Sequence, residues 1–217
     1  MKKKMLKKKD INKVLDLLLD LYPDAKAELD FTNPFELLIA TILSAQCTDV
    51  QVNKTTSKLF KEFKTPEEYL TMTEEQLGRK IYSCGFYKTK SKNILETCRI
   101  LIAKYNSQVP DTIEELMTLP GVGKKTANVV VSNAFGVPAI AVDTHVFRVS
   151  NRIGLADSKN VEDTEVDLMN NIDKEMWTKA HHLIIFHGRR MCRARGPSCE
   201  ICPISPYCFY YNSISKK

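Results

Sequence analysis

The sequence contains no long apolar segment. No run approaches the roughly 18 consecutive apolar residues that a membrane-spanning helix needs, and the lysine-rich start is not followed by the apolar stretch and cleavage site of a secretory signal. Convincing alternation of apolar and polar residues is also missing, as is any internal repeat. We therefore expect a cytoplasmic protein that does not bind membranes, and an all-α fold.

The main part of the chain also lacks net charge. The 217 residues include 32 Lys and Arg against 26 Asp and Glu, but six of the lysines lie within the first nine residues. We predict that this tail is a solvated, disordered end, and a contribution to non-specific nucleic-acid binding stays open. Because the remainder is formally neutral, any specific polyanion site must arise from a local arrangement of charge.

Apolar residues recur almost throughout at helical spacing. Asp10 is a candidate cap for a first helix that stops before Pro23, and Asn33 followed by Pro34 at the first helical position marks a second helix start. Further helices are predicted near residues 50–63, 66–71, 73–83, 88–105, 112–118, 124–135, 144–153, 161–171 and 174–187.

The segment from Leu119 to Ala127, L-P-G-V-G-K-K-T-A, joins two of these helices through a glycine turn. Gly121 and Gly123 leave the turn bare of side chains, so backbone N–H groups can approach an anion closely. Lys124 and Lys125 follow where the second helix begins, and a helix N-terminus attracts phosphate. The alternative interpretation is an ordinary connection with a solvated lysine pair.

Four of the seven cysteines form a cluster near the end of the sequence. Cys192, Cys199, Cys202 and Cys208 lie within 17 residues, in a segment interrupted by glycine and proline. Such a segment builds little core of its own, so a metal centre that ties its loops together is the economical explanation. Tetrahedral zinc and a [4Fe–4S] cluster both accept four thiolates, and the spacing leaves both open.

Basic residues accompany the cluster. Arg193 and Arg195 lie inside its first loop and are well placed to contact phosphates, whereas a merely solvated basic loop is the alternative. The preceding Arg189 and Arg190 could instead neutralise the negative charge of a thiolate-bound centre.

Asp143 lies 18 residues after Lys125, directly before a predicted helix. The simpler interpretation is that its carboxylate caps that helix. The functional interpretation is that the carboxylate acts in the same reaction as Lys125. The two interpretations are compatible, because a capping residue can also be catalytic.

These motifs together resemble the endonuclease III family of helix-hairpin-helix DNA glycosylases. The hairpin, the V-D-T-H around Asp143, the segment S-A-Q-C-T-D that begins at Ser44, and the Cys-x6-Cys-x2-Cys-x5-Cys tail occur in the family's order and spacing, from about Asn33 to Cys208. The resemblance implies a two-lobed fold. Residues 27–137 would form a six-helix lobe with the hairpin, and residues 1–26 and 138–217 a lobe with a [4Fe–4S] loop at 192–208.

The resemblance also implies an activity. The expected enzyme is a base-excision-repair DNA glycosylase and abasic-site lyase that removes oxidised pyrimidines from duplex DNA. Lys125 would be the nucleophile that forms a Schiff base, Asp143 its carboxylate partner, and the turn from Gly121 through Val122 and Gly123 to Lys124 a grip on the DNA backbone. A prokaryotic protein of this kind would associate with the nucleoid, and we expect a monomer.

Two further positions match the family's pattern. Gln46 and Phe86 would fill the gap left when a damaged nucleotide leaves the duplex, the amide by pairing with the orphaned base and the apolar ring as a wedge. Without the resemblance, Gln46 would be a loop residue and Phe86 a core residue. The family commonly has alanine where Cys47 stands and an aliphatic wedge where Phe86 stands, which affects the expected lesion preference.

Two alternatives are weighed against this function. A mismatch-type adenine or thymine glycosylase shares the fold but generally lacks lysine at position 125, and the adenine type carries an additional C-terminal domain. A non-catalytic iron–sulfur DNA-binding module would need neither Lys125 nor Asp143, and this sequence has both.

Overall fold

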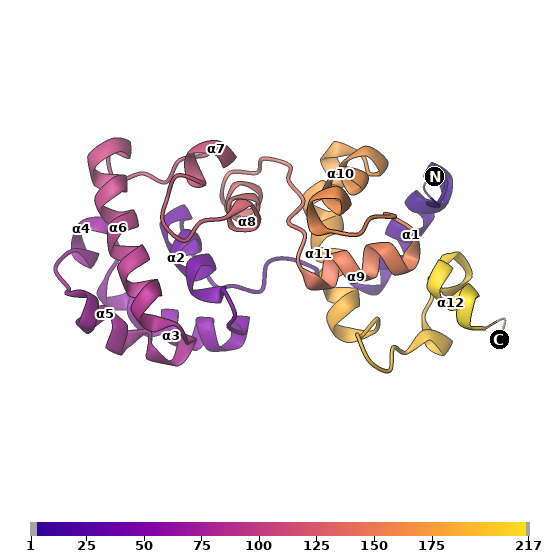
Figure 1. Ribbon diagram of the computed structural model, residues 1–217, viewed down its shortest axis with the longest axis horizontal. Coiled ribbons are helices and arrows are strands. Elements are labelled where there is room, and N and C mark those ends of the chain that lie inside the picture. Colours follow the sequence, from indigo (N-terminus) through magenta and orange to yellow (C-terminus); the bar gives the residue numbers. More distant parts are fainter. Residues whose placement is uncertain (1–3, 216–217) are drawn as a thin grey trace. The chain divides into compact units, whose positions relative to one another are not determined.

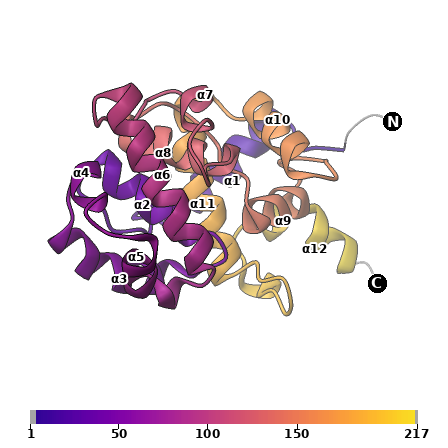
Figure 2. The same ribbon diagram turned by 60° about the vertical axis from the view of Figure 1, so that its left-hand side comes forward.

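The chain divides into two compact units, each built from helices. The computed structural model describes residues 4–215, and the described residues contain no β-strand, so the all-α prediction is confirmed. One unit, called the hairpin unit below, is Ala27–Val137; the other, called the cysteine unit, combines Met1–Lys26 with Pro138–Lys217. Figures 1 and 2 show the helices of each unit.

The hairpin unit contains seven α-helical segments and one short 3-10 helix. They are α2 (Pro34–Ser44), α3 (Asp49–Glu62), α4 (Pro66–Tyr69), α5 (Glu74–Lys80), η1 (Tyr82–Cys84), α6 (Tyr87–Tyr105), α7 (Ile113–Leu116) and α8 (Lys124–Ala134). Two of them, α4 and α7, are single turns of four residues. The long helix α6 packs against α2, α4 and α5, and α8 packs against α2 and α7.

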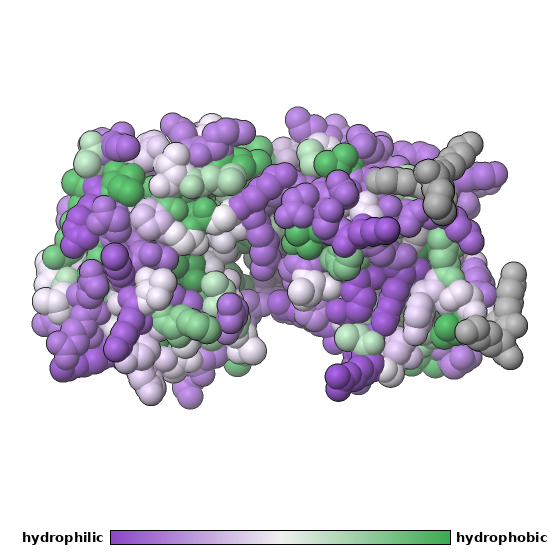
Figure 3. Space-filling model, in the orientation of Figure 1, coloured by the Kyte–Doolittle hydropathy of each residue, from purple (hydrophilic) through white to green (hydrophobic). Residues whose placement is uncertain are grey.

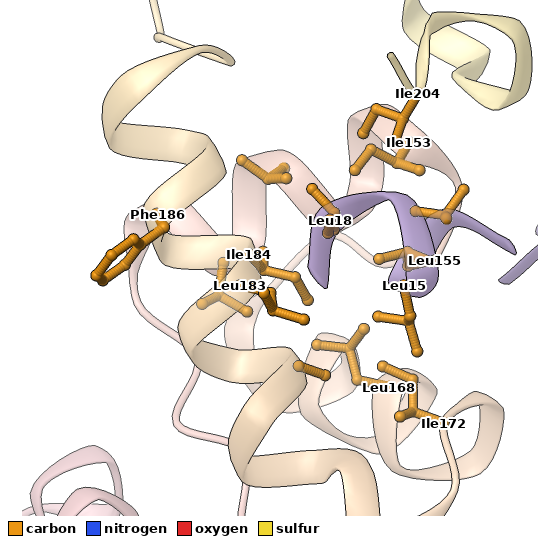
Figure 4. Packing of buried hydrophobic residues seen from close by; sticks show 14 of the residues in the cluster. Leu15, Leu18, Ile153, Leu155, Leu168, Ile172, Leu183, Ile184, Phe186 and Ile204 are labelled. Carbon is orange, nitrogen blue, oxygen red and sulfur yellow. The ribbon is translucent and has the colours of Figure 1, made fainter. Parts of the chain in front are cut away.

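The cysteine unit places the N-terminal helix among the C-terminal ones. Its elements are α1 (Lys8–Leu21), α9 (Thr144–Ile153), α10 (Val161–Asn171), η2 (Lys174–Met176), α11 (Trp177–Arg190), η3 (Cys199–Ile201), η4 (Ser205–Tyr207) and α12 (Phe209–Ile214). Helix α9 lies at the centre, because it packs against α10, α11 and α12. Figure 4 shows the core, where Leu15 and Leu18 of α1 lie among side chains of α9, α10 and α11.

Local sequence signals decide most helix starts. The Oδ1 of Asn33 accepts a hydrogen bond from the Glu36 N–H at 3.0 Å, and Pro34 occupies the first helical position, so the predicted start of α2 is confirmed. The predicted cap at Asp10 is wrong. Helix α1 already begins at Lys8, after an N-cap Lys7 that makes no capping side-chain bond, and Asp10 lies in the first turn, where a carboxylate favours the helix dipole.

From Lys4 onward, the start of the chain is hydrogen-bonded to other residues of the cysteine unit. The Lys4 N–H donates to Asp157 Oδ2 at 2.8 Å, and Lys8 Nζ donates to the Asn171 carbonyl at 3.0 Å and to Asp173 Oδ1 at 2.7 Å. The prediction of a disordered tail is therefore wrong for Lys4–Lys9, while Lys2 and Lys3 lie outside the described residues.

No described helix combines the length and apolar character that crossing a membrane requires. On the face shown in Figure 3, hydrophilic residues are spread over both units and hydrophobic residues form small, separate patches.

Candidate functional site

The turn between α7 and α8 contains two glycines, and each is explained by a different feature of the structure. Gly121 has φ of 80°, and a Cβ there would lie 2.8 Å from Nδ2 of Asn93 on α6. Gly123 has an ordinary φ of −89°, and a Cβ there would meet no atom within 4 Å. The fold therefore requires glycine at 121 but not at 123, where the absent side chain leaves the backbone open to an external group.

Helix α8 begins without an internal cap. Gly123 is its N-cap residue, and no side chain accepts a capping hydrogen bond there. The first N–H groups of a helix have no acceptor within it, and the helix dipole adds partial positive charge, so this end favours an anion. Val122 is buried and its N–H donates to the Leu119 carbonyl at 3.1 Å, which fixes the turn to the unit's core.

Lys124 and Lys125 occupy the first turn of α8, and both are exposed. An ammonium group at a helix N-terminus is unfavourable for the helix, because the dipole is positive at that end. The helix dipole therefore does not explain Lys125 at this position, whereas an external phosphate or electrophile would.

Asp143 caps α9, as the simpler interpretation predicted. Its Oδ1 accepts hydrogen bonds from the N–H groups of His145 and Val146, both at 2.8 Å. Both bonds end on the same oxygen, so the cap uses one of the two carboxylate oxygens. The side chain is half-buried. Asp143 belongs to the cysteine unit and Lys125 to the hairpin unit.

The four clustered cysteines line one cavity. Its other walls are mainly apolar and come from Ile153, Met191, Ile204 and Tyr210 among others. Burial, together with the smaller repulsion from the three other cysteines, raises the pKa of the Cys202 thiol to about 11. Among residues 4–215, no three His, Cys, Asp or Glu side chains are grouped as a site for a single metal ion.

The cysteine loop is held by arginines of α9 that the sequence did not single out. Arg148 donates from Nη2 to the carbonyls of Gly188 and Cys192, both at 3.0 Å. Arg152 donates to the Arg193 carbonyl at 2.7 Å and the Ala194 carbonyl at 3.1 Å, and its Nη1 lies 3.6 Å from Cys192 Sγ. Their spacing of four residues on one helix face was the signal available.

Arg193 and Arg195 are both exposed, while the backbone of their loop is fixed by Arg152. Arg190 differs, because its guanidinium lies 4.2 Å from the ring centroid of Phe186 and 5.8 Å from that of Tyr22. The loop thus presents two basic side chains to solvent from a constrained backbone.

Gln46 and Phe86 share an uncommon backbone conformation. Their φ angles are 55° and 48°, in the left-handed region, which costs an ordinary residue about 1–2 kcal/mol. Both side chains are exposed, so the interpretation of Phe86 as a core residue is wrong. Left-handed strain at non-glycine residues concentrates where function requires a particular geometry.

Similarity to known proteins defines the class of protein to which this chain belongs. The HhH-GPD superfamily of base excision DNA repair proteins matches residues 39–174. Endonuclease III of Rickettsia conorii is 50% identical over 204 residues, which cover 94% of this chain and 97% of that relative. Endonuclease III of Bacillus subtilis is 50% identical over 205 residues, 94% of each chain.

Two solved structures share the whole fold. A non-covalent endonuclease III–DNA complex has a TM-score of 0.93 at 50% identity and covers 98% of this chain and 100% of that one. A trapped endonuclease III–DNA covalent intermediate has a TM-score of 0.92 at 50% identity, with coverages of 97% and 100%. This chain belongs to the endonuclease III family of the HhH-GPD superfamily.

Proposed function

We propose that this chain is a base-excision-repair DNA glycosylase and abasic-site lyase that acts on oxidised pyrimidines in duplex DNA. The observation that carries the proposal is the exposed Lys125 in the first turn of α8, a helix whose N-terminus has no internal cap. Support comes from about 50% identity to endonuclease III over nearly the whole chain, and from the trapped covalent complex with DNA of a similar protein.

The reaction begins with extrusion of the damaged nucleotide, which costs a few kcal/mol and least for a lesion that pairs poorly. The lone pair of the neutral Lys125 amine attacks C1′ of the sugar, and the bond from C1′ to the base breaks as the base leaves with its electron pair. Loss of a proton from nitrogen and opening of the sugar ring give an imine. Removal of a C2′ proton then expels the 3′ phosphate by β-elimination, and water releases Lys125 by hydrolysis.

Asp143 has two roles in this proposal. One carboxylate oxygen caps α9, and the other stabilises the positive charge that develops on the sugar or relays a proton. Capping by two N–H groups fixes the carboxylate in place before the substrate binds, so little reorganisation is needed during the reaction.

Hydrogen-bond donors of each unit bind phosphates of the DNA backbone. In the hairpin unit these are the N–H groups after Gly123 and the side chain of Lys124, on a turn shaped by Gly121 and Val122. In the cysteine unit they are Arg193 and Arg195. Phosphate contacts of this kind position the protein without reading sequence, as a search for rare lesions requires. We infer that a monomer acts at cytoplasmic, nucleoid DNA.

The four cysteines suit a [4Fe–4S] cluster. Four thiols spread around the wall of one cavity fit a group with several metal atoms, each taking one thiolate. Cys192, Cys199, Cys202 and Cys208 would hold it, and it would supply structural cross-linking of the loops rather than chemistry on DNA. Arg152, beside Cys192 Sγ, offsets the negative charge of the thiolates.

The test is covalent trapping. Sodium borohydride added during reaction with a duplex containing an oxidised pyrimidine should reduce the imine and give a stable protein–DNA adduct. Lys124→Ala, the matched control one residue away, should still form the adduct, whereas Lys125→Ala should form none while keeping affinity for an abasic duplex. Adduct formation by Lys125→Ala at the rate of the unmodified chain would show that another group is the nucleophile.

A further inference from the structure

A lysine is buried between the segments that carry Gln46 and Phe86. Lys90 lies in the first turn of α6 and is only 4% exposed. Its Nζ donates to the carbonyls of Leu43 at 2.8 Å and of Cys84 at 2.7 Å. Burial lowers the pKa of Lys90, because desolvation disfavours its charged form. Burying a lysine is costly, and both of these acceptors are main-chain oxygens rather than a carboxylate.

The two acceptors are the ends of two helices. Leu43 belongs to the last turn of α2, and Cys84 is the last residue of η1. Carbonyls at a helix C-terminus accept no hydrogen bond from within the helix and carry partial negative charge. An amine or ammonium group is therefore a favourable hydrogen-bond donor to them. Lys90 therefore caps the C-terminal ends of two helices with one side chain.

The residues that follow these two ends are the strained, exposed ones. Gln46 comes three residues after Leu43 and Phe86 two residues after Cys84, and both have positive φ. The Lys90 N–H also donates to the Phe86 carbonyl at 3.0 Å, which starts α6. One residue thus holds the base of the Gln46 segment by its side chain and the base of the Phe86 segment by side chain and backbone.

Two further polar contacts join α3, the helix that follows the Gln46 segment, to η1, which precedes Phe86. Gln51 of α3 donates from Nε2 to Ser83 Oγ at 2.9 Å, and Cys84 Sγ lies 3.5 Å from Thr55 Oγ1. Without Lys90, these bonds would still hold α3 beside η1. The Lys90 amine therefore determines how the Gln46 and Phe86 segments are positioned relative to each other, and not whether this part of the unit packs together.

We propose that Lys90 is a positioning residue that fixes Gln46 and Phe86 relative to each other, so that both enter the duplex together when a damaged nucleotide is extruded. This inference rests on the proposed glycosylase function. Because the Lys90 amine donates to the carbonyls of Leu43 and Cys84, and not to the hairpin turn or Lys125, its loss should affect extrusion and leave the lyase chemistry intact.

The experiment compares two reactions of one enzyme. Lys90→Met keeps the length and apolar stem of the side chain but donates no hydrogen bond; Lys92→Met, at an exposed position of the same helix, is the control for loss of one charge. Single-turnover rates are measured per trappable enzyme, titrated with borohydride on abasic DNA, so that any unfolded fraction cancels. Lys90→Met should slow release of a paired oxidised pyrimidine about 10- to 100-fold and slow cleavage at a preformed abasic site less than threefold.

A double-mutant cycle separates positioning from general destabilisation. In a chain that already carries Gln46→Ala and Phe86→Ala, Lys90→Met should cause less than a threefold further loss, because nothing remains to be positioned. If Lys90→Met does not fold, Lys90→Gln, which keeps an amide donor, takes its place with a smaller expected loss.

Two outcomes would overturn the inference: an equal loss in both reactions, or a full additional loss in the Ala/Ala background. The proposed function fails in a different way, namely if the unmodified chain releases no base and forms no adduct.

Discussion

Helices α8 and α9 begin in opposite ways. At the start of α8, Gly123 contributes no side chain, and the end of the helix is open to an external anion. At the start of α9, Asp143 supplies its own carboxylate to two N–H groups. In the first arrangement no side chain of the protein caps the N–H groups at the helix start, so they can bind an external anion. In the second, two such N–H groups fix an acidic side chain. The comparison shows how the same helix-end physics yields either a phosphate site or a preorganised carboxylate.

The largest expected effect comes from removing the charge at α9 while keeping the cap. Asparagine caps a helix about as well as aspartate, so Asp143→Asn should leave the free energy of unfolding within about 0.5 kcal/mol. Base release should slow by roughly 100- to 1,000-fold, because electrostatic stabilisation of the developing charge is lost. Single-turnover kinetics and denaturant unfolding measure the two quantities.

Asp143→Ala is the matched variant for the cap. It should lose the same activity and also about 1 kcal/mol of stability. If Asp143→Asn retained normal base release, the carboxylate would be a cap and nothing more.

A second variant makes α8 begin like α9. Gly123→Asp supplies an internal acceptor at a position where a Cβ meets nothing within 4 Å, so the unfolding free energy should rise by up to about 1 kcal/mol. Affinity for an abasic duplex should fall at least tenfold, since the carboxylate competes with and repels phosphate. Binding titrations at several salt concentrations provide the measurement, with Gly123→Ala as the control for size. Undiminished affinity in Gly123→Asp would mean that this helix end does not contact the DNA backbone.

The smallest expected effect separates the two glycines of the turn. Gly121→Ala places a Cβ at φ of 80° and 2.8 Å from Asn93 Nδ2, so it should lower the unfolding free energy by about 1 kcal/mol. Gly123→Ala, at ordinary φ, should not. Thermal unfolding of the two variants side by side measures the difference, and equal stability would contradict the conformational reason given for Gly121.

Sequence reasoning succeeded where the determining contacts are local. The caps at Asn33 and Asp143 act within three residues, and the four cysteines that line one cavity lie within 17, so these groupings are visible in the chain, while the metal centre stays a prediction. Asp10 shows the limit of the same reasoning. An acidic residue near a helix start is equally consistent with the cap and with the first turn, and the structure has the second.

Sequence patterns did not reveal which residues become partners when the two lie far apart in the chain. Lys90 binds a carbonyl 47 residues away, and Arg148 binds one 44 residues away. In the sequence Lys90 is one lysine among several on α6, and only burial distinguishes it. The left-handed conformation of Gln46 and Phe86 was equally hidden, because neither residue type favours it.

That conformation has a consequence for engineering. Glycine adopts positive φ without steric strain, and the strain relieved exceeds its additional loss of chain entropy, so selection for heat resistance alone would favour glycine at positions 46 and 86. The resulting protein would be as stable or more so, yet without the amide and the ring proposed to enter the duplex. Thermal robustness and lesion search therefore place opposing demands on the same two backbone positions.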